Sequence, residues 1–248
     1  SYPNLNFIDN KEGFDKIINT NYHFYKKLQE GIAEHLGYKN AKWIKPILNI
    51  KPKERPIKNK YVVINIHSTT QMKYWNHPDG KKVRDTSPYW NELCRILRKN
   101  GLTPVVVEKE ELWGVNPYYN GLPKKSVKRV GMPLEEVVNY IQHAEFFIGL
   151  SSGLAWIAHG LGKKTAIIAN FTNEDHEIPL DENNYKRITK KDVCHGCWNN
   201  PKYGLMSIYR GKNDTWDECP EHKDTKREFE CHTSITPEQV FNEIKDWI

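Results

Sequence analysis

The alternation of short β-branched runs with segments of helical spacing most constrains the fold of this chain. The run Tyr61-Val62-Val63-Ile64-Asn65-Ile66 is almost wholly apolar, which is typical of a strand buried on both faces. Strands that alternate with helices predict an α/β fold with a Rossmann-like, doubly wound parallel sheet between helix layers. We expect strands at 61–66, 103–108, 127–130, 146–150 and 165–169, and helices at 21–36, 88–100, 133–141, 153–161 and 237–247.

The length and composition bound the class of protein. A chain of 248 residues holds one large domain with an appendage, or two small domains. No apolar run approaches the roughly 20 residues that a membrane helix needs, so we expect no membrane span. The start, Ser1-Tyr2-Pro3-Asn4, carries neither a secretory signal nor an initiator Met. We therefore expect a cytoplasmic protein, and a fragment of a longer chain is an open alternative.

The charge of the chain is mildly basic. Lys and Arg number 37 against 31 Asp and Glu, which gives a formal net charge of +6. This surplus suits a nucleotide or another phosphorylated ligand. It includes no long basic run and no RNA-recognition signature, so we expect no nucleic acid as a partner.

Four cysteines lie in the last quarter of the chain with the spacing C-x2-C-x21-C-x11-C: Cys194, Cys197, Cys219 and Cys231. A CxxC turn lets two thiolates meet one ion, and two more from a returning segment complete a tetrahedral sulfur shell. The intervening segment has few aliphatic residues, so a cross-link would replace missing burial. We predict a four-cysteine metal finger over residues 191–235. Two disulfides and unpaired buried thiols are the alternatives, although a reducing compartment favours metal.

Hydroxyls and a lysine follow the first expected strand. Thr69, Thr70 and Lys73 can donate hydrogen bonds and positive charge to phosphate oxygens, and strand-end loops are where such ligands bind. These three residues are therefore candidates for holding a diphosphate. The alternative is a polar loop with an incidental lysine.

Small residues form the turn after the strand at 146–150. Ser151, Ser152 and Gly153 leave backbone N–H groups open at the start of a helix, which is a site for anions. Small residues also serve plain close packing. The turn matches neither the G-x-S-x-G motif of esterases nor the G-x-G-x-x-G motif of dehydrogenases, so both classes lose support.

Two further candidates concern the nucleoside. Glu108 ends the second strand, where a carboxylate can accept hydrogen bonds from ribose hydroxyls. A solvated loop acid is the alternative for Glu108. Gly131, in the turn after the strand at 127–130, is expected to line the same pocket.

The chain as a whole divides into four segments. We expect an N-terminal helical segment and linker at 1–57, a Rossmann-like domain at 58–190, the metal finger at 191–235 and a C-terminal helix at 236–248.

These motifs resemble those of a known family. The loop His67-Ser68-Thr69-Thr70 with Lys73 resembles the phosphate-binding loop of bacterial heptosyltransferases, and the turn from Gly149 to Gly162 resembles their second donor loop. The closer similarity is to the autotransporter heptosyltransferases. The residues that carry it are Phe147 to Trp156, Cys194-His195-Gly196-Cys197, Trp216, Cys219-Pro220, Phe229 and Cys231, and the resemblance covers about residues 22–248.

The resemblance implies an activity and a cofactor. Members of this family are two-domain GT-B enzymes that transfer heptose from ADP-heptose to Ser or Thr hydroxyls, and they carry an iron-binding cysteine finger. By that likeness the chain is a glycosyltransferase donor-binding half with a nucleotide-sugar donor, a hydroxyl acceptor in a protein, and structural iron. Zinc is the alternative metal.

The chain departs from the family pattern in two ways. Ser151-Ser152-Gly153-Leu154-Ala155-Trp156 replaces the Asp-Thr-Gly-Leu-x-His of the lipopolysaccharide enzymes. Residues 1–57 are also too few for an acceptor domain, which implies a missing domain, a homo-oligomer or another partner, or a reduced acceptor site. The general base is unassigned, with Asp79 and Asp85 as the local candidates. A non-catalytic module that binds a nucleotide sugar or a protein is the alternative function.

Overall fold

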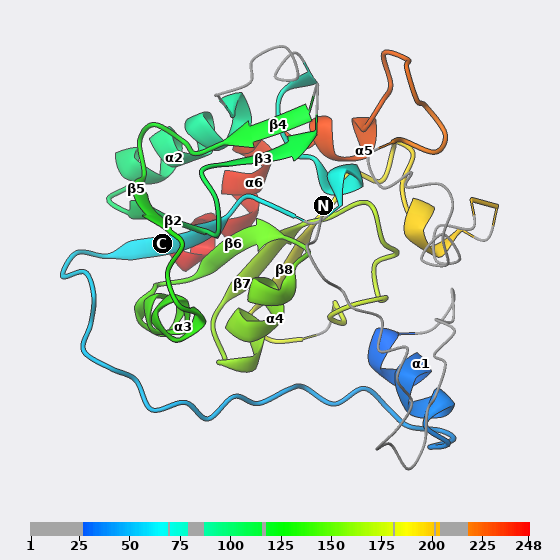
Figure 1. Ribbon diagram of the computed structural model, residues 1–248, viewed down its shortest axis with the longest axis horizontal. Helices are drawn as coiled ribbons and strands as arrows, with labels where there is room; N and C mark the ends of the chain where they lie inside the picture. The colour runs from blue at the N-terminus through cyan, green and yellow to red at the C-terminus, as the bar shows by residue number, and fades with distance from the viewer. Residues whose placement is uncertain are drawn as a thin grey trace.

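Six parallel strands form the centre of the protein, and helices cover both faces of the sheet (Figure 1). The computed structural model describes residues 27–68, 70–78, 87–115, 118–180, 182–200, 202–203 and 218–248. The strands are β1 Tyr61–Asn65, β2 Thr103–Glu108, β3 Leu112–Val115, β4 Tyr118–Gly121, β5 Val127–Val130, β6 Phe147–Leu150, β7 Thr165–Ile168 and β8 Tyr185–Ile188. The helices are α1 Leu28–His35, α2 Pro88–Lys99, α3 Leu134–His143, α4 Gly153–Gly160, α5 Glu230–Thr233 and α6 Pro237–Ile244, with short 3-10 turns η1 Gln71–Lys73, η3 Cys197–Asn199 and η5 Lys245–Trp247.

The order of the strands confirms the doubly wound arrangement expected from the sequence. The sheet runs β5-β2-β1-β6-β7-β8, and all five pairings are parallel. The chain first builds outward from β1 through β2 to β5, and then returns to the other side of β1 as β6. The order therefore reverses between β1 and β6, and this switch point is where open α/β sheets bind ligands.

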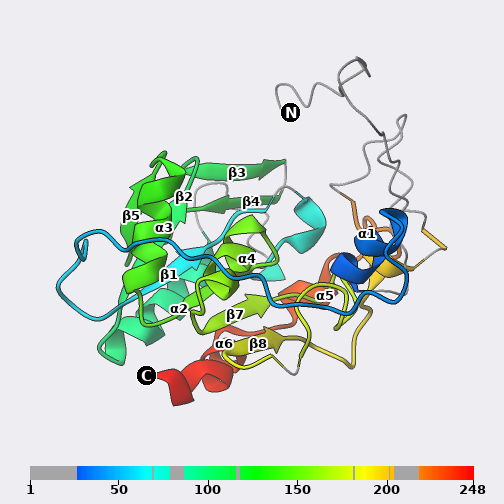
Figure 2. The same cartoon turned by 90° about the horizontal axis from the view of Figure 1, so that it is seen from below.

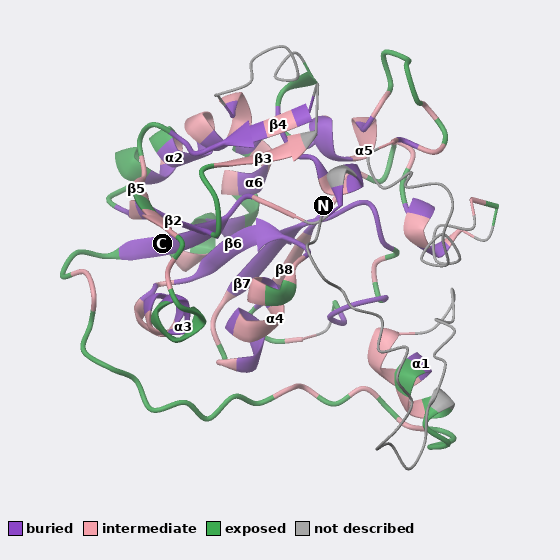
Figure 3. Cartoon of the chain, in the orientation of Figure 1, coloured by how far each residue is buried: buried purple, intermediate pink, exposed green. Residues whose placement is uncertain are grey.

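The two faces of each strand bury different helices, because successive side chains of a strand point to opposite sides. Val62 and Ile64 of β1 belong to the apolar cluster that includes residues of α2 and α6. Tyr61 and Val63 belong to the cluster that includes residues of α3 and α4. Figure 3 shows the strands buried between these layers. The C-terminal helix α6 is thus part of the main core, packed beside α2.

An extended strap, residues 36–60, joins α1 to β1 along the α3 and α4 side of the sheet (Figure 2). Hydrogen bonds attach it to both helices: Leu48 N donates to Gly160 O at 2.8 Å, and Lys53 N donates to the side chain of Asn139 at 3.1 Å. The part of the expected helix before residue 27 lies outside the described residues.

The structure contains strands that the sequence pattern did not predict. No strand was expected between residues 170 and 192, yet β8 forms there as the edge strand beside β7. The β3–β4 hairpin is a separate two-stranded antiparallel sheet. Lys186 and Arg187 interrupt the apolar run of β8, which is why the pattern resembled a loop.

The metal-finger part of the expected fold class is not seen. Within residues 191–235 the described part forms η3 and α5, and residues 204–217 are not described. Across the described residues, no helix is both long and apolar enough to cross a membrane.

Candidate functional site

A cavity of about 1200 Å³ opens at the carboxyl ends of the strands that flank the switch point. Its walls come from the loops after β1, β2, β5 and β6. The lining residues include six of the sequence candidates, Lys73, Glu108, Gly131, Ser151, Ser152 and Gly153, together with Asn65, His67, Ser68, Trp113 and Glu177. Segments far apart in the sequence therefore meet where parallel-sheet geometry predicts a ligand.

The loop after β1 brings one expected cation to the cavity. Lys73 closes the 3-10 turn η1, in which its N–H donates to Thr70 O at 3.1 Å. The Lys73 ammonium donates to Ser151 O at 2.7 Å and to Ser151 Oγ at 3.2 Å. Thr70 itself is buried and does not line the cavity, and Thr69 lies outside the described residues.

The turn after β6 contributes a helix N-terminus. Ser152 precedes α4, whose first residue is Gly153, and no side chain among the described residues caps this helix. The first N–H groups of a helix lack partners within the helix, so they are available to an anion. The Ser152 hydroxyl donates to Asn65 Oδ1 at 2.8 Å, which fixes the turn to the end of β1.

Glu108 is held by the protein as well as facing the cavity. Its Oε1 accepts hydrogen bonds from Asn65 Nδ2 at 2.8 Å, from His67 N at 3.0 Å and from the N–H of Ile66. Its Oε2 lies 3.2 Å from His67 Nδ1. Gly131 N donates to the carbonyl of Glu108 at 2.9 Å. The Glu108 carboxylate therefore links the end of β2 to the end of β1 by hydrogen bonds. Its contact with a ribose stays a prediction.

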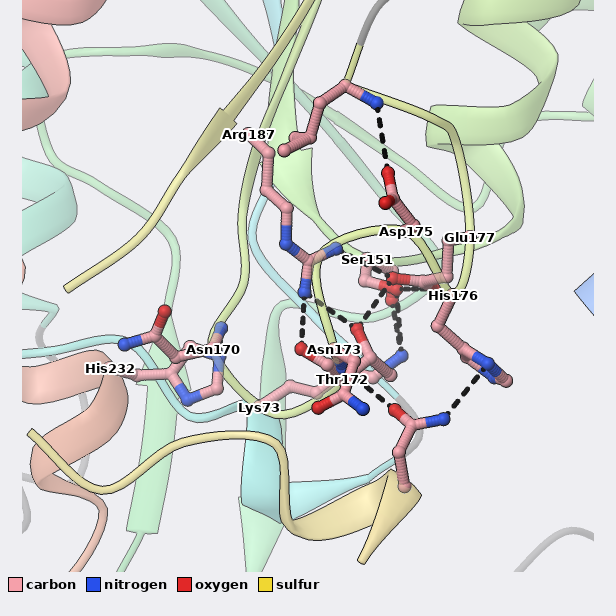
Figure 4. Close-up of polar contacts among 12 residues, drawn as sticks. Lys73, Ser151, Asn170, Thr172, Asn173, Asp175, His176, Glu177, Arg187 and His232 are labelled. Carbon is pink, nitrogen blue, oxygen red and sulfur yellow. Dashed lines mark hydrogen bonds and ion pairs between the residues drawn. The ribbon is translucent and has the colours of Figure 1, made fainter. Parts of the chain in front are cut away.

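Behind Lys73 lies a buried polar network that local patterns in the sequence did not reveal (Figure 4). The Ser151 hydroxyl donates to Glu177 Oε1, and the Thr172 hydroxyl donates to Glu177 Oε2 at 3.0 Å. Arg187, on β8, reaches Glu177 Oε2 at 3.4 Å and donates to Thr172 O at 2.7 Å. The network joins the loops after β1, β6 and β7 to the edge strand.

Burial and charge act on these groups in opposite directions. Burial lowers the pKa of Lys73, the nearby Glu177 carboxylate opposes this fall, and Arg187 adds to it. Burial alone would raise the pKa of Glu177, but Lys73, Arg187 and the hydrogen bonds from Ser151 and Thr172 hold it below its usual value. Glu177 is therefore a carboxylate stabilised by two cations.

The four cysteines gather at one end of the molecule as free thiols. Cys197 and Cys219 are buried with Phe229 in a small apolar cluster, and Cys194 packs against it. Burial raises the pKa of Cys197 to about 12, and interactions with Cys194 and Cys219 add to the rise. The pKa of Cys231 is raised by burial and by the other three thiols. Even so, no three His, Cys, Asp or Glu side chains of the described residues have the arrangement of a metal site.

The cysteine segments are hydrogen-bonded to the loop that begins the Glu177 network. Gly196 N donates to Asn170 O at 2.7 Å, and Trp198 N donates to Phe171 O at 3.0 Å. The Asn170 side-chain amide donates to Cys231 O at 2.8 Å. The cysteine cluster is thus connected to the wall of the cavity through residues 170–172.

Both candidate residues for a general base, Asp79 and Asp85, lie outside the described residues. Asn173 and Glu174 line a second, smaller cavity of about 580 Å³ on the other side of the Glu177 network.

The strand order and the position of the cavity define a doubly wound α/β domain, and its likeness to a solved glycosyltransferase makes the fold GT-B-like. The structure of TibC, an iron-containing dodecameric glycosyltransferase from enterotoxigenic Escherichia coli, matches this one with a TM-score of 0.72 at 29% identity. The match covers 89% of this chain and 53% of that chain. Another TibC structure is a complex with ADP-D-beta-D-heptose.

Sequence comparison gives the family. The autotransporter heptosyltransferase BAHTCr of Citrobacter rodentium is 33% identical over 223 residues, which cover 86% of this chain and 48% of that protein. The autotransporter heptosyltransferase Aah of Escherichia coli is 33% identical over 201 residues, covering 81% of this chain and 46% of that protein. No family model matches the chain. The chain belongs to the autotransporter heptosyltransferase family, and it spans about half the length of the curated relatives it matches.

One more distant relative is named as inactive. BimC of Burkholderia thailandensis, named an inactive autotransporter heptosyltransferase, is 25% identical over 207 residues, covering 81% of this chain and 43% of that protein.

Proposed function

We propose that the chain is the donor-binding part of a heptosyltransferase that transfers a sugar from ADP-heptose to a Ser or Thr hydroxyl of a protein. The observation that carries the proposal is the meeting of the Lys73 ammonium, Ser151 and the N-terminus of α4 at the switch point of the sheet. These groups supply the positive charge and N–H donors that a diphosphate requires. The sequence similarity to heptosyltransferases points to the sugar.

The proposed roles follow from position. Lys73 and the amides of Ser152 and Gly153 bind the diphosphate, and they stabilise the charge that develops on the leaving nucleoside diphosphate. Glu108 and Gly131 border the nucleoside end of the cavity. We assign no general base, because neither the sequence nor the comparisons identify one among the described residues that line the cavity.

We also propose that Cys194, Cys197, Cys219 and Cys231 hold a structural metal, iron by family likeness and zinc as the alternative. The packing supports this set, because Cys197 and Cys219 share a small apolar cluster that Cys194 packs against. Asn170 also joins the CxxC turn to Cys231, since its carbonyl accepts from Gly196 N and its side-chain amide donates to Cys231 O. Four thiolates would fill a tetrahedral shell and leave no position open for chemistry. A reducing compartment such as the cytoplasm would keep these thiols available to the metal.

Assembly into homo-oligomers is a further part of the proposal, suggested by the dodecameric TibC. Light scattering on the purified chain would measure its mass in solution. A monomeric mass at all protein concentrations would contradict the proposed homo-oligomer.

The decisive test is calorimetric titration with ADP-heptose and with a GDP-sugar. We expect the chain to bind ADP-heptose, and the Lys73→Met variant to bind it about 10- to 100-fold more weakly, because charge-assisted hydrogen bonds are lost. Lys99→Met is the matched control, since Lys99 is exposed at the far end of α2. Equal affinity of the Lys73 variant and the parent chain would remove Lys73 from the site.

A radiolabelled transfer assay separates the enzyme from the non-catalytic alternative. Binding of ADP-heptose without hydrolysis or transfer, in the full-length protein with its acceptor, would favour the binding module, as in a relative named inactive.

A further inference from the structure

The Lys73 ammonium is held in a way that leaves one donor for a ligand. An ammonium carries three N–H groups. Two of them point at Ser151, at its carbonyl and at its hydroxyl oxygen. Lys73 also lines the large cavity, so the third donor is the one that can face a phosphate. Its direction therefore depends on how firmly Ser151 is held.

Glu177 holds Ser151 from behind (Figure 4). The Ser151 hydroxyl donates its hydrogen bond to Glu177 Oε1, which leaves the hydroxyl oxygen to accept from Lys73. The other carboxylate oxygen already accepts from Thr172 and Arg187. The Glu177 side chain is 11% exposed, and the Arg187 side chain is fully buried. Both oxygens of Glu177 are thus engaged by hydrogen bonds within the protein.

The same network balances charge beside the cavity. The charged or titratable groups that act on Lys73 are Glu177 and Arg187, and Lys73 and Arg187 in turn act on His232. Among Lys73, Glu177 and Arg187 there are two cations and one anion. Without the anion, Lys73 and Arg187 would repel each other in a buried setting.

We propose that Glu177 and Arg187 are positioning residues of the donor site, which orient the Lys73 ammonium through Ser151 and set the charge that it presents to the diphosphate. This inference rests on the function proposed above. It extends that function, because neither residue is required to touch the donor. The directions of the pKa shifts agree with it, since Glu177 raises the pKa of Lys73 and Arg187 lowers it.

The proposal predicts opposite effects for two substitutions. Glu177→Gln keeps an acceptor for Ser151 but removes the anion, so the pKa of Lys73 should fall further. Arg187→Met keeps much of the shape but removes the second cation, so the pKa of Lys73 should rise. Thr172→Val is the matched control, because it removes hydrogen bonds to both Glu177 and Arg187 and leaves every charge in place.

The experiment measures ADP-heptose affinity by calorimetry across the alkaline range, where the phosphates of this diester do not titrate. In the parent chain we expect affinity to fall as Lys73 loses its proton. The pH at the midpoint of this fall in affinity should be lower by about one unit in Glu177→Gln and higher by a similar amount in Arg187→Met. In Thr172→Val the pH at this midpoint should be unchanged, even if the variant is thermally less stable.

A ligand-free measurement keeps failure of the inference separate from failure of the proposed function. The ionisation of Lys73 is followed by NMR of its side-chain ¹³Cε, assigned by the signal lost in Lys73→Arg. Opposite shifts in the two variants without any binding of ADP-heptose would overturn the donor site and leave the charge coupling standing. Unchanged midpoints, shifts of the same sign, or a uniform loss of affinity that follows stability would overturn the positioning role.

Discussion

At the scale of single residues, Glu108 lies at the end of β2 as expected, but it also has a structural role that the sequence did not predict. Its place at the end of β2 predicted a ribose contact. In the structure its carboxylate also accepts the N–H groups of Ile66 and His67, which follow β1. These N–H groups lie beyond the last pairing of β1 with β2, so the ladder of the sheet does not satisfy them. A side chain from the neighbouring strand replaces the missing strand partner.

Replacing Glu108 therefore tests a structural role together with a binding role. We expect Glu108→Ala to lower the free energy of unfolding by about 2–4 kcal/mol, because it leaves buried donors without an acceptor. Urea denaturation measures this, with Glu111→Ala as the control, since Glu111 is exposed in the same turn. A change in Glu108→Ala within about 0.5 kcal/mol, as for ordinary surface positions, would contradict the role.

Single residues also mark the limit of what the sequence could predict about the site. Lys73, Ser151 and Gly153 were recognisable because each lies in the segment that follows a strand whose apolar residues identify it. Arg187 was not recognisable. It lies on an edge strand and meets Glu177, ten positions away, only after β7 and β8 have paired. No local pattern signals a contact that exists only in the folded sheet.

At the scale of the elements, the central strands were predictable because they are buried on both faces and their residues are correspondingly apolar. β8 was missed because its outward residue is charged. Lys186 extends over the ring of Trp247 at 4.9 Å and pairs with Asp246, so it is partly covered despite its charge. The hairpin β3–β4 lies outside the main sheet and lacks that apolar signature.

Gly149 of β6 gives a prediction about strand packing. A Cβ at this position would lie 3.0 Å from Asn65 O of β1 and 3.0 Å from the Phe147 ring. A backbone carbonyl in a sheet cannot easily move away, so Gly149→Ala should press β6 away from β1 at the switch point. We expect a loss of stability of about 1–3 kcal/mol and weaker binding of ADP-heptose.

Thermal denaturation and calorimetry measure these effects, and Gly153→Ala is the control for stability. A Cβ on Gly153 meets no atom of the described residues within 4 Å. Equal stability of the Gly149 and Gly153 variants would show that the sheet tolerates the extra methyl group.

At the scale of the whole molecule, hydrogen bonds connect the cysteine cluster to the large cavity at the switch point of the sheet. Residues 170–172 receive backbone hydrogen bonds from the CxxC turn on one side. On the other side, the Thr172 hydroxyl binds Glu177, which holds Ser151 and thereby Lys73. A cross-link that orders the cysteine segments would therefore also order the wall of the cavity. The spacing of the cysteines predicted a shared metal site, which stays a prediction, and this connection could not be predicted because it depends on pairings across the sheet.

Loss of the metal should for this reason affect binding as well as folding. We expect the purified chain to contain about one metal ion per molecule and Cys219→Ser to contain almost none, with a lower Tm. The same variant should bind ADP-heptose more weakly, since the loop that supports Glu177 loses its anchor. Plasma mass spectrometry, thermal denaturation and calorimetry measure the three effects.

Cys94→Ala is the matched control, because Cys94 is a buried thiol of α2 in the main core. This variant should lose stability and keep its metal. Retention of metal by Cys219→Ser would exclude Cys219 as a ligand, and full donor affinity in a metal-free chain would disprove the connection between the two sites.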